Sequence, residues 1–361
     1  MGRGVGTVLV TGAFGLVGSE TVAQLHQQGR HVVATDLDIP ANRKASRGLP
    51  AGVEVRWADL TDAHQVSALV ADVAPEAIIH LAAVIPTACY RNVGLAQRVN
   101  VAGTASLVAA AERLAVKPRF VQASSVAVHG PRNPRRDEEL GPDSPLRPID
   151  CYGAQKLEAE RTVRDSDLEW VVLRLGAVVS TRLRDLPISA DVLFLEWSSP
   201  IDGRITTVDV RDAANAFVAA TTADVVGETL MIGGDASHRR LQGYLGPALT
   251  EAIGLSDCYP PGRPGDPDDD DTWFVCDWMD TARAQEALGF QNHSLPDMLV
   301  EVRARVGRWR VLFAAASPIA RAMLKRRQPY RGHPGTYADP WGLVFQRWPE
   351  AAAEGRSRRP T

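Results

Sequence analysis

The first half of the chain alternates short runs of β-branched residues with longer segments whose apolar residues recur at helical spacing. This alternation predicts a parallel sheet covered by helices on both faces, because parallel strands are joined by crossover connections. Right-handed crossovers give a doubly wound α/β fold with its ligand crevice at the carboxyl ends of the strands. The expected strands are Thr7–Thr11, His31–Thr35, Glu54–Trp57, Ala77–Leu81, Phe120–Ala123 and Trp170–Leu175, and the expected helices include Ser19–Gln28, His64–Val73 and Gly94–Leu114.

Beyond about residue 178 the alternation becomes irregular. Residues 179–205 and 236–302 are expected to form a smaller C-terminal substrate-binding lobe, whereas 206–235 return to a strand and helix pattern. The sequence therefore predicts a nucleotide-binding core at 1–178 to which 206–235 return. The segment Pro260–Asp271 (PPGRPGDPDDDD) is expected to be a solvated loop, since it lacks the turn glycine and distal glutamate of a calcium-binding loop.

The composition is that of an ordinary globular chain. Of 361 residues 45% are hydrophobic and the net charge is -3, which excludes disorder as the main state. No run of about 18 apolar residues is present, which excludes a membrane-spanning helix. The N-terminus shows no secretory pattern, and the four cysteines lie far apart without metal-ligand spacing. We therefore expect a cytoplasmic protein without a disulfide framework and without a bound metal.

A glycine-rich turn follows the first expected strand and opens the first expected helix. In this context Gly12 would permit a tight turn, Gly15 the close approach of a pyrophosphate, and Gly18 close packing of helix and strand. The helix N-terminus would offer free N–H groups and the positive end of its dipole to phosphates. The alternative is a strand-to-helix turn without a ligand.

A carboxylate at the end of the second strand supports the dinucleotide interpretation. Asp36 lies 24 positions after Gly12, where it would accept hydrogen bonds from the adenosine ribose and repel a 2′-phosphate. No Arg or Lys follows it directly, so the sequence favours NAD over NADP. After the third strand, Asp59 and Leu60 are placed to contact the adenine.

Four polar residues carry the candidate chemistry. Tyr152 and Lys156 are four residues apart, hence on one face of a helix, and a nearby ammonium is expected to lower the pKa of a phenol. Ser124 and Ser125 end the fifth strand, at the edge where a parallel sheet presents its chemistry.

Together these motifs resemble the extended branch of the short-chain dehydrogenase/reductase superfamily, which includes NAD-dependent epimerases and dehydratases. The resemblance covers about residues 5–235 and implies a Rossmann fold with NAD as cofactor. The motifs that carry it are TGAFGLVG, TD, ADL, HLAA (His80–Ala83), Asn100, SSVAVHG and YGAQK, in that order, followed by VDVRD (Val208–Asp212) and DTARAQEALGF (Asp280–Phe290).

The resemblance also implies a role for each matching residue. Tyr152 is expected to be the general acid/base, Lys156 to bind the nicotinamide ribose and keep Tyr152 acidic, and Ser125 to bond the substrate oxygen. The other residues expected at the cofactor are Leu16 and Val17 at the pyrophosphate, with Leu81, Ala82, Ala83 and Asn100 beside it.

Three residues near these motifs have a structural alternative. Asn100 could serve only to bond a backbone carbonyl. His80 is expected to be a satisfied core histidine, and His129 part of a pocket wall.

Two departures from the family's patterns bear on the reaction. Ser125-Val126-Ala127 replaces the Thr-Asp-Glu of sugar-nucleotide dehydratases, and Ala177 stands where sugar-nucleotide epimerases carry an asparagine. These departures favour an NAD-dependent oxidoreductase that moves a hydride between NAD(H) and a secondary alcohol or ketone, with Tyr152 as acid/base. The alternative is a nucleotide-sugar epimerase with tightly bound NAD. A non-catalytic dinucleotide sensor is disfavoured, because it has no need of Ser125, Tyr152 and Lys156.

The C-terminal segment 303–361 is basic, whereas the rest of the chain is acidic. Residues 303–327 carry eight Lys/Arg and no acid around an apolar stretch, which suits peripheral contact with an anionic membrane. Packing on the acidic body or a partner subunit is favoured instead, because Pro318 is expected to interrupt a short helix. The other expected partners are a small-molecule substrate and, from the resemblance, a second copy of the chain; no nucleic-acid module is recognised.

Overall fold

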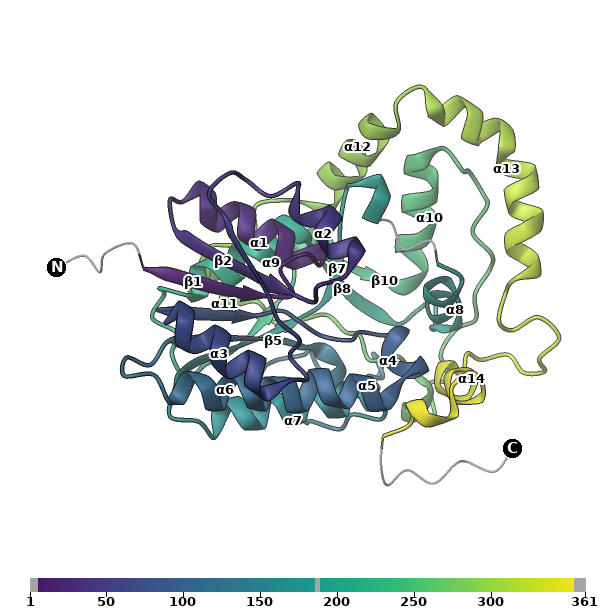
Figure 1. Cartoon of the computed structure of the whole chain (residues 1–361). Coiled ribbons are helices and arrows are strands. Elements are labelled where there is room, and N and C mark those ends of the chain that lie inside the picture. The colour runs from purple at the N-terminus through teal and green to yellow at the C-terminus, as the bar shows by residue number, and fades with distance from the viewer. Residues whose placement is uncertain (1–5, 186–188, 354–361) are drawn as a thin grey trace.

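The computed structural model describes residues 6–185 and 189–353. Its centre is a seven-stranded, all-parallel sheet in the order β3-β2-β1-β4-β5-β6-β9 (Figure 1). This order, with β1 in the middle and crossovers running outward on both sides, confirms the doubly wound sheet. The strands are β1 (Thr7–Thr11), β2 (His31–Asp36), β3 (Glu54–Trp57), β4 (Ala77–His80), β5 (Arg119–Ser125), β6 (Glu169–Leu175) and β9 (Thr229–Ile232).

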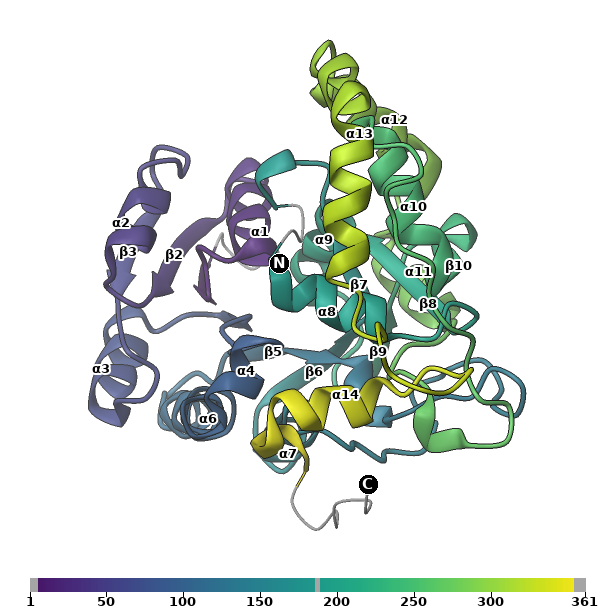
Figure 2. The ribbon, with the colours of Figure 1, turned by 90° about the vertical axis from the view of Figure 1, so that its right-hand side faces the viewer.

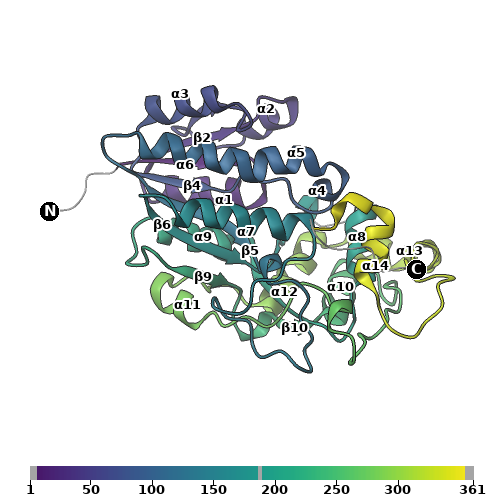
Figure 3. The same ribbon diagram turned by 90° about the horizontal axis from the view of Figure 1, so that it is seen from below.

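Helices cover both faces of this sheet because successive residues of a strand point to opposite sides. In β1, Val8 and Val10 belong to one apolar core, and Leu9 belongs to the other. The first core is closed by α1 (Leu16–Gln27), α9 (Val210–Ala220) and α11 (Ala282–Leu288). The second is closed by α3 (Ala63–Val73), α6 (Thr104–Glu112) and α7 (Cys151–Arg164), which Figure 3 shows lying across the sheet.

The helix expected over Gly94–Leu114 is continuous but not uniform. It consists of α5 (Val93–Gln97), a π-helical segment η1 (Arg98–Gly103) and α6. A Cβ on Gly103 would lie 3.2 Å from Leu60 Cβ, so this segment passes close to the end of the third strand. The widened turn carries Asn100 at a position where π-helical segments often serve a site.

A second, three-stranded sheet forms the smaller lobe. Its order is β10 (Arg239–Leu241), β8 (Arg204–Asp209) and β7 (Ala177–Val179), and β7 follows β6 after a single residue. That residue is Gly176, whose Cβ would lie 2.6 Å from Thr206 O, so no larger side chain fits between the sheets. Of the segment predicted to return to the core, α9 and β9 do so, whereas β8 belongs to this small sheet.

The remaining elements connect or extend these layers. The irregular segment 179–205 contains a helix, α8. The helices of this group are α2 (Pro40–Ser46), α4 (Ala88–Arg91), α8 (Ala190–Ser198), α10 (Gln242–Ile253), α12 (Leu295–Val306), α13 (Trp309–Arg326) and α14 (Pro340–Arg347); the short 3-10 turns are η2 (Val126–His129), η3 (Leu183–Asp185), η4 (Ala236–His238), η5 (Asp270–Thr272) and η6 (Pro349–Ala351).

The expectation that Pro318 interrupts the helix is wrong, since α13 runs through it for 18 residues. Pro260–Asp271 is an irregular surface loop up to the short turn η5, as expected, but part of it is packed: Arg263 donates to the carbonyls of His333 and Tyr330, and thereby holds the chain between α13 and α14. The two helices diverge from this segment (Figure 2), and α14 packs on α8 and on η6, which in turn contacts α7.

Candidate active site

The glycine turn between β1 and α1 has the tight geometry expected of it. Gly12 has φ +65°, and a Cβ there would lie 2.6 Å from Ala82 N. A Cβ on Gly18 would lie 2.1 Å from Gly12 O, so only glycine lets α1 approach the turn. At Gly15 the nearest atom would be 3.2 Å away, and this residue begins the helix. At Gly12 and Gly18, therefore, neighbouring backbone atoms leave no room for a side chain.

The N-terminus of α1 offers unused donors. Gly15, the residue before the helix, provides no side-chain cap. Within the described residues, the N–H groups of Leu16, Val17 and Gly18 donate no hydrogen bond to the chain. Free N–H groups at a helix N-terminus bind anions such as phosphates. This is the arrangement that a dinucleotide pyrophosphate requires.

Two carboxylates lie at the ends of β2 and β3. Burial raises the pKa of Asp36, against hydrogen bonds donated by the N–H groups of Leu37 and Phe14. Asp59 accepts from the N–H of Thr61 at 2.8 Å, and the neighbouring Leu60 is buried. Asp36 therefore joins the glycine turn through Phe14, and its second oxygen lies at the turn between β2 and α2.

The loop after β4 lies over the glycine turn. Leu81 N donates to Thr11 O and Ala82 N to Thr11 Oγ1, and Ala83 follows at the start of the loop. Asn100 reaches the next residue, accepting from Val84 N at 2.8 Å and donating to Val84 O at 3.0 Å. Its amide nitrogen also donates to Gln155 at 2.9 Å. The side chain of Asn100 thus fixes the loop rather than facing outward.

Ser125 and Tyr152 are brought together by the first turn of α7. Their side chains lie close enough for Ser125 to stabilise a Tyr152 phenolate, and Ser125 Oγ accepts from Ala127 N at 3.2 Å. A Cβ on Gly153 would lie 2.4 Å from Ala127 O, so glycine at this position allows α7 to pack directly on η2. The sequence-predicted pair is therefore adjacent because of the glycine that follows Tyr152.

The N-terminus of α7 is fixed by a buried carboxylate. Asp150 caps the helix by accepting from Gly153 N at 3.2 Å, and its other oxygen accepts from Tyr90 Oη at 2.6 Å. Burial raises the pKa of Asp150 to about 6, against these two bonds. Asp150 also pairs with Ala352 near the C-terminal end of the described chain. Sequence reasoning did not single out this residue.

Lys156 is buried one turn beyond Tyr152. Its ammonium donates to Ala123 O at 3.0 Å and lies 5.9 Å from the centre of the Tyr152 ring. Burial lowers the pKa of Lys156 to about 8, opposed by the charge of Glu160. The remaining two protons of the ammonium are free for a ligand.

The expectation that Lys156 lowers the pKa of Tyr152 is not met in the structure. Burial raises the pKa of Tyr152 above its usual value, and hydrogen bonding from Ser125 to the phenolate only partly opposes this shift. The reason is that desolvation disfavours a buried phenolate more than an ammonium several ångströms from the ring favours it. Tyr152 is accordingly protonated at neutral pH.

A buried ion pair supports the strand ends. Arg174 donates two bonds to Glu160, at 2.8 and 2.9 Å, and Ser124 Oγ donates to the same carboxylate. Burial alone would raise the pKa of Glu160, but the bonds from Arg174 outweigh it and keep the pKa below its usual value. Glu160 lies four residues, or one helical turn, after Lys156, and this spacing in the sequence was a signal that the two charges lie on the same face of α7.

Both histidines have structural contacts. His80 bonds Thr11 Oγ1 and Thr104 Oγ1, and burial lowers its pKa to about 3, as expected for a satisfied core histidine. His129 lies 3.2 Å from Arg174 Nη1, and burial followed by the charge of Arg174 lowers its pKa to about 4. Both imidazoles are therefore uncharged at neutral pH.

An apolar wall beside Tyr152 comes from the end of the chain. Trp341 of α14 stacks on Phe274, with ring centres 5.3 Å apart, and Trp348 contacts the Tyr90 ring. Tyr152 packs against this cluster. Local sequence patterns gave no signal for it, because the segments that meet are more than 60 residues apart.

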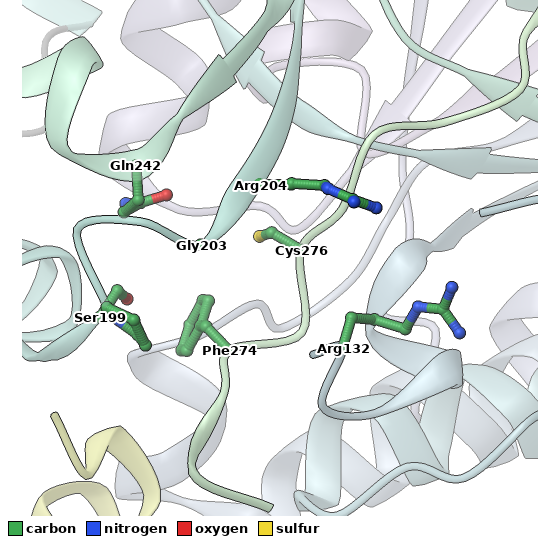
Figure 4. Close-up of a pocket in the computed structure, with 8 residues that line it drawn as sticks. Arg132, Ser199, Gly203, Arg204, Gln242, Phe274 and Cys276 are labelled. Carbon is green, nitrogen blue, oxygen red and sulfur yellow. The ribbon is translucent and has the colours of Figure 1, made fainter. Parts of the chain in front are cut away.

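A small pocket of about 10 Å³, room for about one water molecule, lies in the smaller lobe next to this wall (Figure 4). It is lined by Phe274, Cys276 and Gln242, together with Arg132 and Arg204. Both arginines contact Asp277, at 3.0 and 3.6 Å, so their charge is already compensated. No group of three or more His, Cys, Asp or Glu in residues 6–185 and 189–353 is arranged to hold a metal ion.

The glycine turn, the free N–H groups of α1 and the carboxylate of Asp36 fit a dinucleotide, and Ser125, Tyr152 and Lys156 lie at the same edge of the sheet. Fold and site thus define an NAD-binding protein of the Rossmann class. A sequence profile described as the NAD dependent epimerase/dehydratase family matches residues 8–233. The chain belongs to that family, whose cofactor is NAD.

Individual relatives agree with this assignment. A UDP-glucose 4-epimerase of Mycolicibacterium smegmatis is 30% identical over 312 residues, which cover 78% of this chain and 92% of the relative. A UDP-glucose 4-epimerase of Azospirillum brasilense is 31% identical over 173 residues and 47% of its own length. The chain spans about half the length of this and of the first curated relative it matches.

A solved structure with the same fold is MoeE5 in complex with UDP-glucose and NAD. It is 26% identical, with a TM-score of 0.65, and the match covers 84% of this chain and 99% of that one. The solved structure is thus matched almost completely, whereas part of the present chain has no counterpart in it.

Proposed function

We propose that this protein is a sugar epimerase of the extended short-chain type, acting on a nucleotide sugar with NAD retained between turnovers. The observation that carries the proposal is the Ser125–Tyr152 pair beside Lys156, at the edge of the sheet where the glycine turn and Asp36 would hold NAD. Its relatives in sequence are UDP-glucose 4-epimerases, and MoeE5 was solved with a UDP-sugar and NAD.

In this proposal the chain supplies orientation and proton transfer. Bound NAD would supply the site that takes up a hydride from the sugar carbon and returns it. Tyr152 would act in its ionised form, which the positive charges of Lys156 and of bound NAD⁺ would favour over the protonated form of the empty site. The phenolate would take the proton of the reacting hydroxyl and the resulting phenol would give it back, while Ser125 donates a hydrogen bond to the same oxygen. Lys156 directs its free protons to the nicotinamide ribose.

The same proposal assigns the other residues expected at the cofactor. The pyrophosphate would lie against Gly12, Gly15, Leu16, Val17 and Gly18, the adenosine ribose at Asp36, and the adenine at Asp59 and Leu60. Beside the cofactor would lie Leu81, Ala82, Ala83 and Asn100.

The second candidate is the oxidoreductase that the sequence placed first, with NAD exchanged at each turnover. It is favoured by Ala177, at the start of β7, where epimerases of this resemblance carry an asparagine. The two functions share Ser125, Tyr152 and Lys156 and differ in whether net NADH appears.

The deciding experiment uses the purified full chain. Released dinucleotide is measured after denaturation, and UDP-glucose, UDP-galactose and UDP-glucuronic acid are then incubated with the protein and separated by chromatography. We expect about one NAD per chain and interconversion of one epimer pair without net NADH. Tyr152→Phe should lower the rate by roughly 100-fold or more, because the acid/base is removed.

Tyr337→Phe is the matched control, since Tyr337 is exposed and should leave the rate unchanged. Net NADH formation from a secondary alcohol, with protein that is empty as purified, would replace the epimerase with the oxidoreductase. Activity retained in Tyr152→Phe would refute both.

A homodimer and a cytoplasmic location remain part of the proposal. The support for the location is that all four cysteines are free thiols, including Cys89 and Cys151, whose sulfurs are 3.5 Å apart. Light scattering of the purified chain tests the dimer.

A further inference from the structure

Helix α13 lies along the outer edge of the smaller lobe, beside α10 and α12 (Figures 1 and 2). It is held on one side only. Arg310 donates to Glu251 O at 3.3 Å, Ser317 O accepts from the Cys258 thiol at 3.3 Å, and Arg321 donates to Ser256 O at 3.5 Å. Ser317 is the buried residue among those of α13 that the structure describes.

The apolar residues of α13 form a continuous stripe that the body does not cover. They recur every three or four residues, which places them on one face of a helix. At 3.6 residues per turn this face lies about a third of a turn away from Ser317 and Arg321. We name it the α13 stripe: Trp309 (58% exposed), Leu312 (59%), Phe313 (41%), Ile319 (69%) and Met323 (53%), with Ala316 between them.

The rest of α13 and its flanks are strongly cationic. Residues 302–338 contain no Asp or Glu. Arg303, Arg308, Lys325, Arg326 and Arg327 form no ion pair with any residue the structure describes. Exposed arginines and lysines therefore border an exposed apolar stripe. A partner for this surface needs both an apolar region and negative charge.

We propose that the α13 stripe docks this protein on the surface of an anionic lipid bilayer. A bilayer supplies an apolar layer for Trp309, Leu312 and Phe313 and anionic headgroups for the flanking cations. Two copies of α13 facing each other would bring like charges together, which disfavours self-association through the stripe. No helix in the described part of the chain is long and apolar enough to cross a bilayer, so α13 would lie parallel to the surface.

Docking would bring the reactive edge of the sheet toward the bilayer. The carboxyl ends of the central strands point to the side of the molecule where α13 lies (Figure 1). The proposal goes beyond the reaction itself and does not depend on which sugar or alcohol is converted. A protein that binds vesicles but fails as an epimerase, or the reverse, separates the two proposals.

The test is flotation of the full chain with vesicles of phosphatidylcholine alone and with about 30% phosphatidylglycerol added. We expect binding to the anionic vesicles, lost with phosphatidylcholine alone and weakened when salt is raised from about 0.05 M to about 0.5 M. Leu312→Gln/Ile319→Gln/Met323→Gln should reduce binding about tenfold or more. Val116→Gln/Val300→Gln/Val311→Gln changes three exposed apolar residues outside the stripe and should bind as the unaltered chain does.

Charge is tested separately. Arg308→Gln/Arg326→Gln should weaken binding at low salt, whereas Arg47→Gln/Arg113→Gln, two exposed cations of the nucleotide-binding half, should not. Because all these side chains are exposed, thermal unfolding should be unchanged in every variant. Absence of vesicle binding, or equal binding by the stripe variant and its control, overturns the proposal. It is equally overturned if light scattering shows a dimer that the stripe variant converts to a monomer while no vesicles are bound.

Discussion

Helices α13 and α14 lie close together in the sequence and have similar compositions, yet their apolar faces have opposite fates. Both carry tryptophan, phenylalanine and leucine together with arginine. In α13 the tryptophan, Trp309, is 58% exposed, and in α14 Trp341 is 2% exposed. The difference lies in what each helix faces.

The side chains of helix α14 pack against aromatic rings and pair with an acidic group of the body. Trp341 stacks on Phe274 and donates to Trp273 O at 2.8 Å. Arg347 lies over the Phe194 ring at 4.5 Å and pairs with Asp191. Among the described residues, helix α13 has one acidic partner, Asp257, which pairs with Arg321 at 3.5 Å, and its aromatic side chains stack on no other ring. An amphipathic sequence indicates that the apolar face of a helix needs an apolar partner. Whether that partner belongs to the same chain depends on the surface that the helix meets in the fold.

The largest effect expected from this comparison is on stability. Trp341→Ala should lower the free energy of unfolding by about 3–5 kcal/mol, because a buried, stacked side chain is removed. Trp309→Ala should change it by less than about 0.5 kcal/mol. Urea denaturation of both variants measures the difference. Equal losses would mean that α13 is packed against protein in solution.

A smaller effect concerns pH, at the point where the turn after α14 meets α7. Burial raises the folded-state pKa of Asp150 to about 6, above its usual 3.8. A carboxyl with a raised pKa holds its proton more tightly when folded, so its contribution to stability is present below pH 3.8 and is lost as pH rises to about 6.

The stability difference between the unaltered chain and Asp150→Asn should therefore fall by roughly 1.4 kcal/mol per pH unit across that window and level off above it. Chemical denaturation at closely spaced pH values measures it, and the subtraction removes all other titrating groups. A difference that is flat, or that rises with pH, contradicts the assignment.

The smallest effect concerns the joint between the two helices. Tyr330 Oη donates to Ser198 O at 2.6 Å and accepts from Asp339 N at 2.8 Å. Tyr330→Phe leaves both main-chain groups without this partner and should cost about 2 kcal/mol. Tyr337→Phe, at an exposed position, should cost less than about 0.5 kcal/mol. If the two variants unfold alike, the joint does not hold α14 in place.

The nucleotide-binding half was predictable because its determinants are local. Strand periodicity placed β1 and β3 to the residue, and the glycines of the turn are required by contacts within a few positions or with the next strand. The pairing of Ser125 with Tyr152 followed from the order of strand and helix. The raised pKa of Tyr152 did not, since four-residue spacing brings Lys156 near but says nothing of burial.

The wall beside Tyr152 was not predictable for a related reason. Trp341 finds Phe274, and Trp348 finds Tyr90, across separations of 67 and 258 positions in the sequence. No periodic pattern reports which distant surface a helix will meet. The continuity of α13 through Pro318 could not be predicted either. Proline usually breaks a helix, but contacts such as the bond from the Cys258 thiol to Ser317 O hold α13 in place.

The position of α14 has a consequence for the order in which this protein is made. A ribosome adds roughly 5–20 residues per second and releases the N-terminal part of a chain first. The glycine turn and the first strands can assemble early. The apolar wall beside Tyr152 can form only after Trp341 and Trp348, near the end of the described chain, have been synthesised. A nascent chain that has not yet reached α14 would therefore lack the apolar wall beside Tyr152, whatever part of the nucleotide-binding half it had already folded.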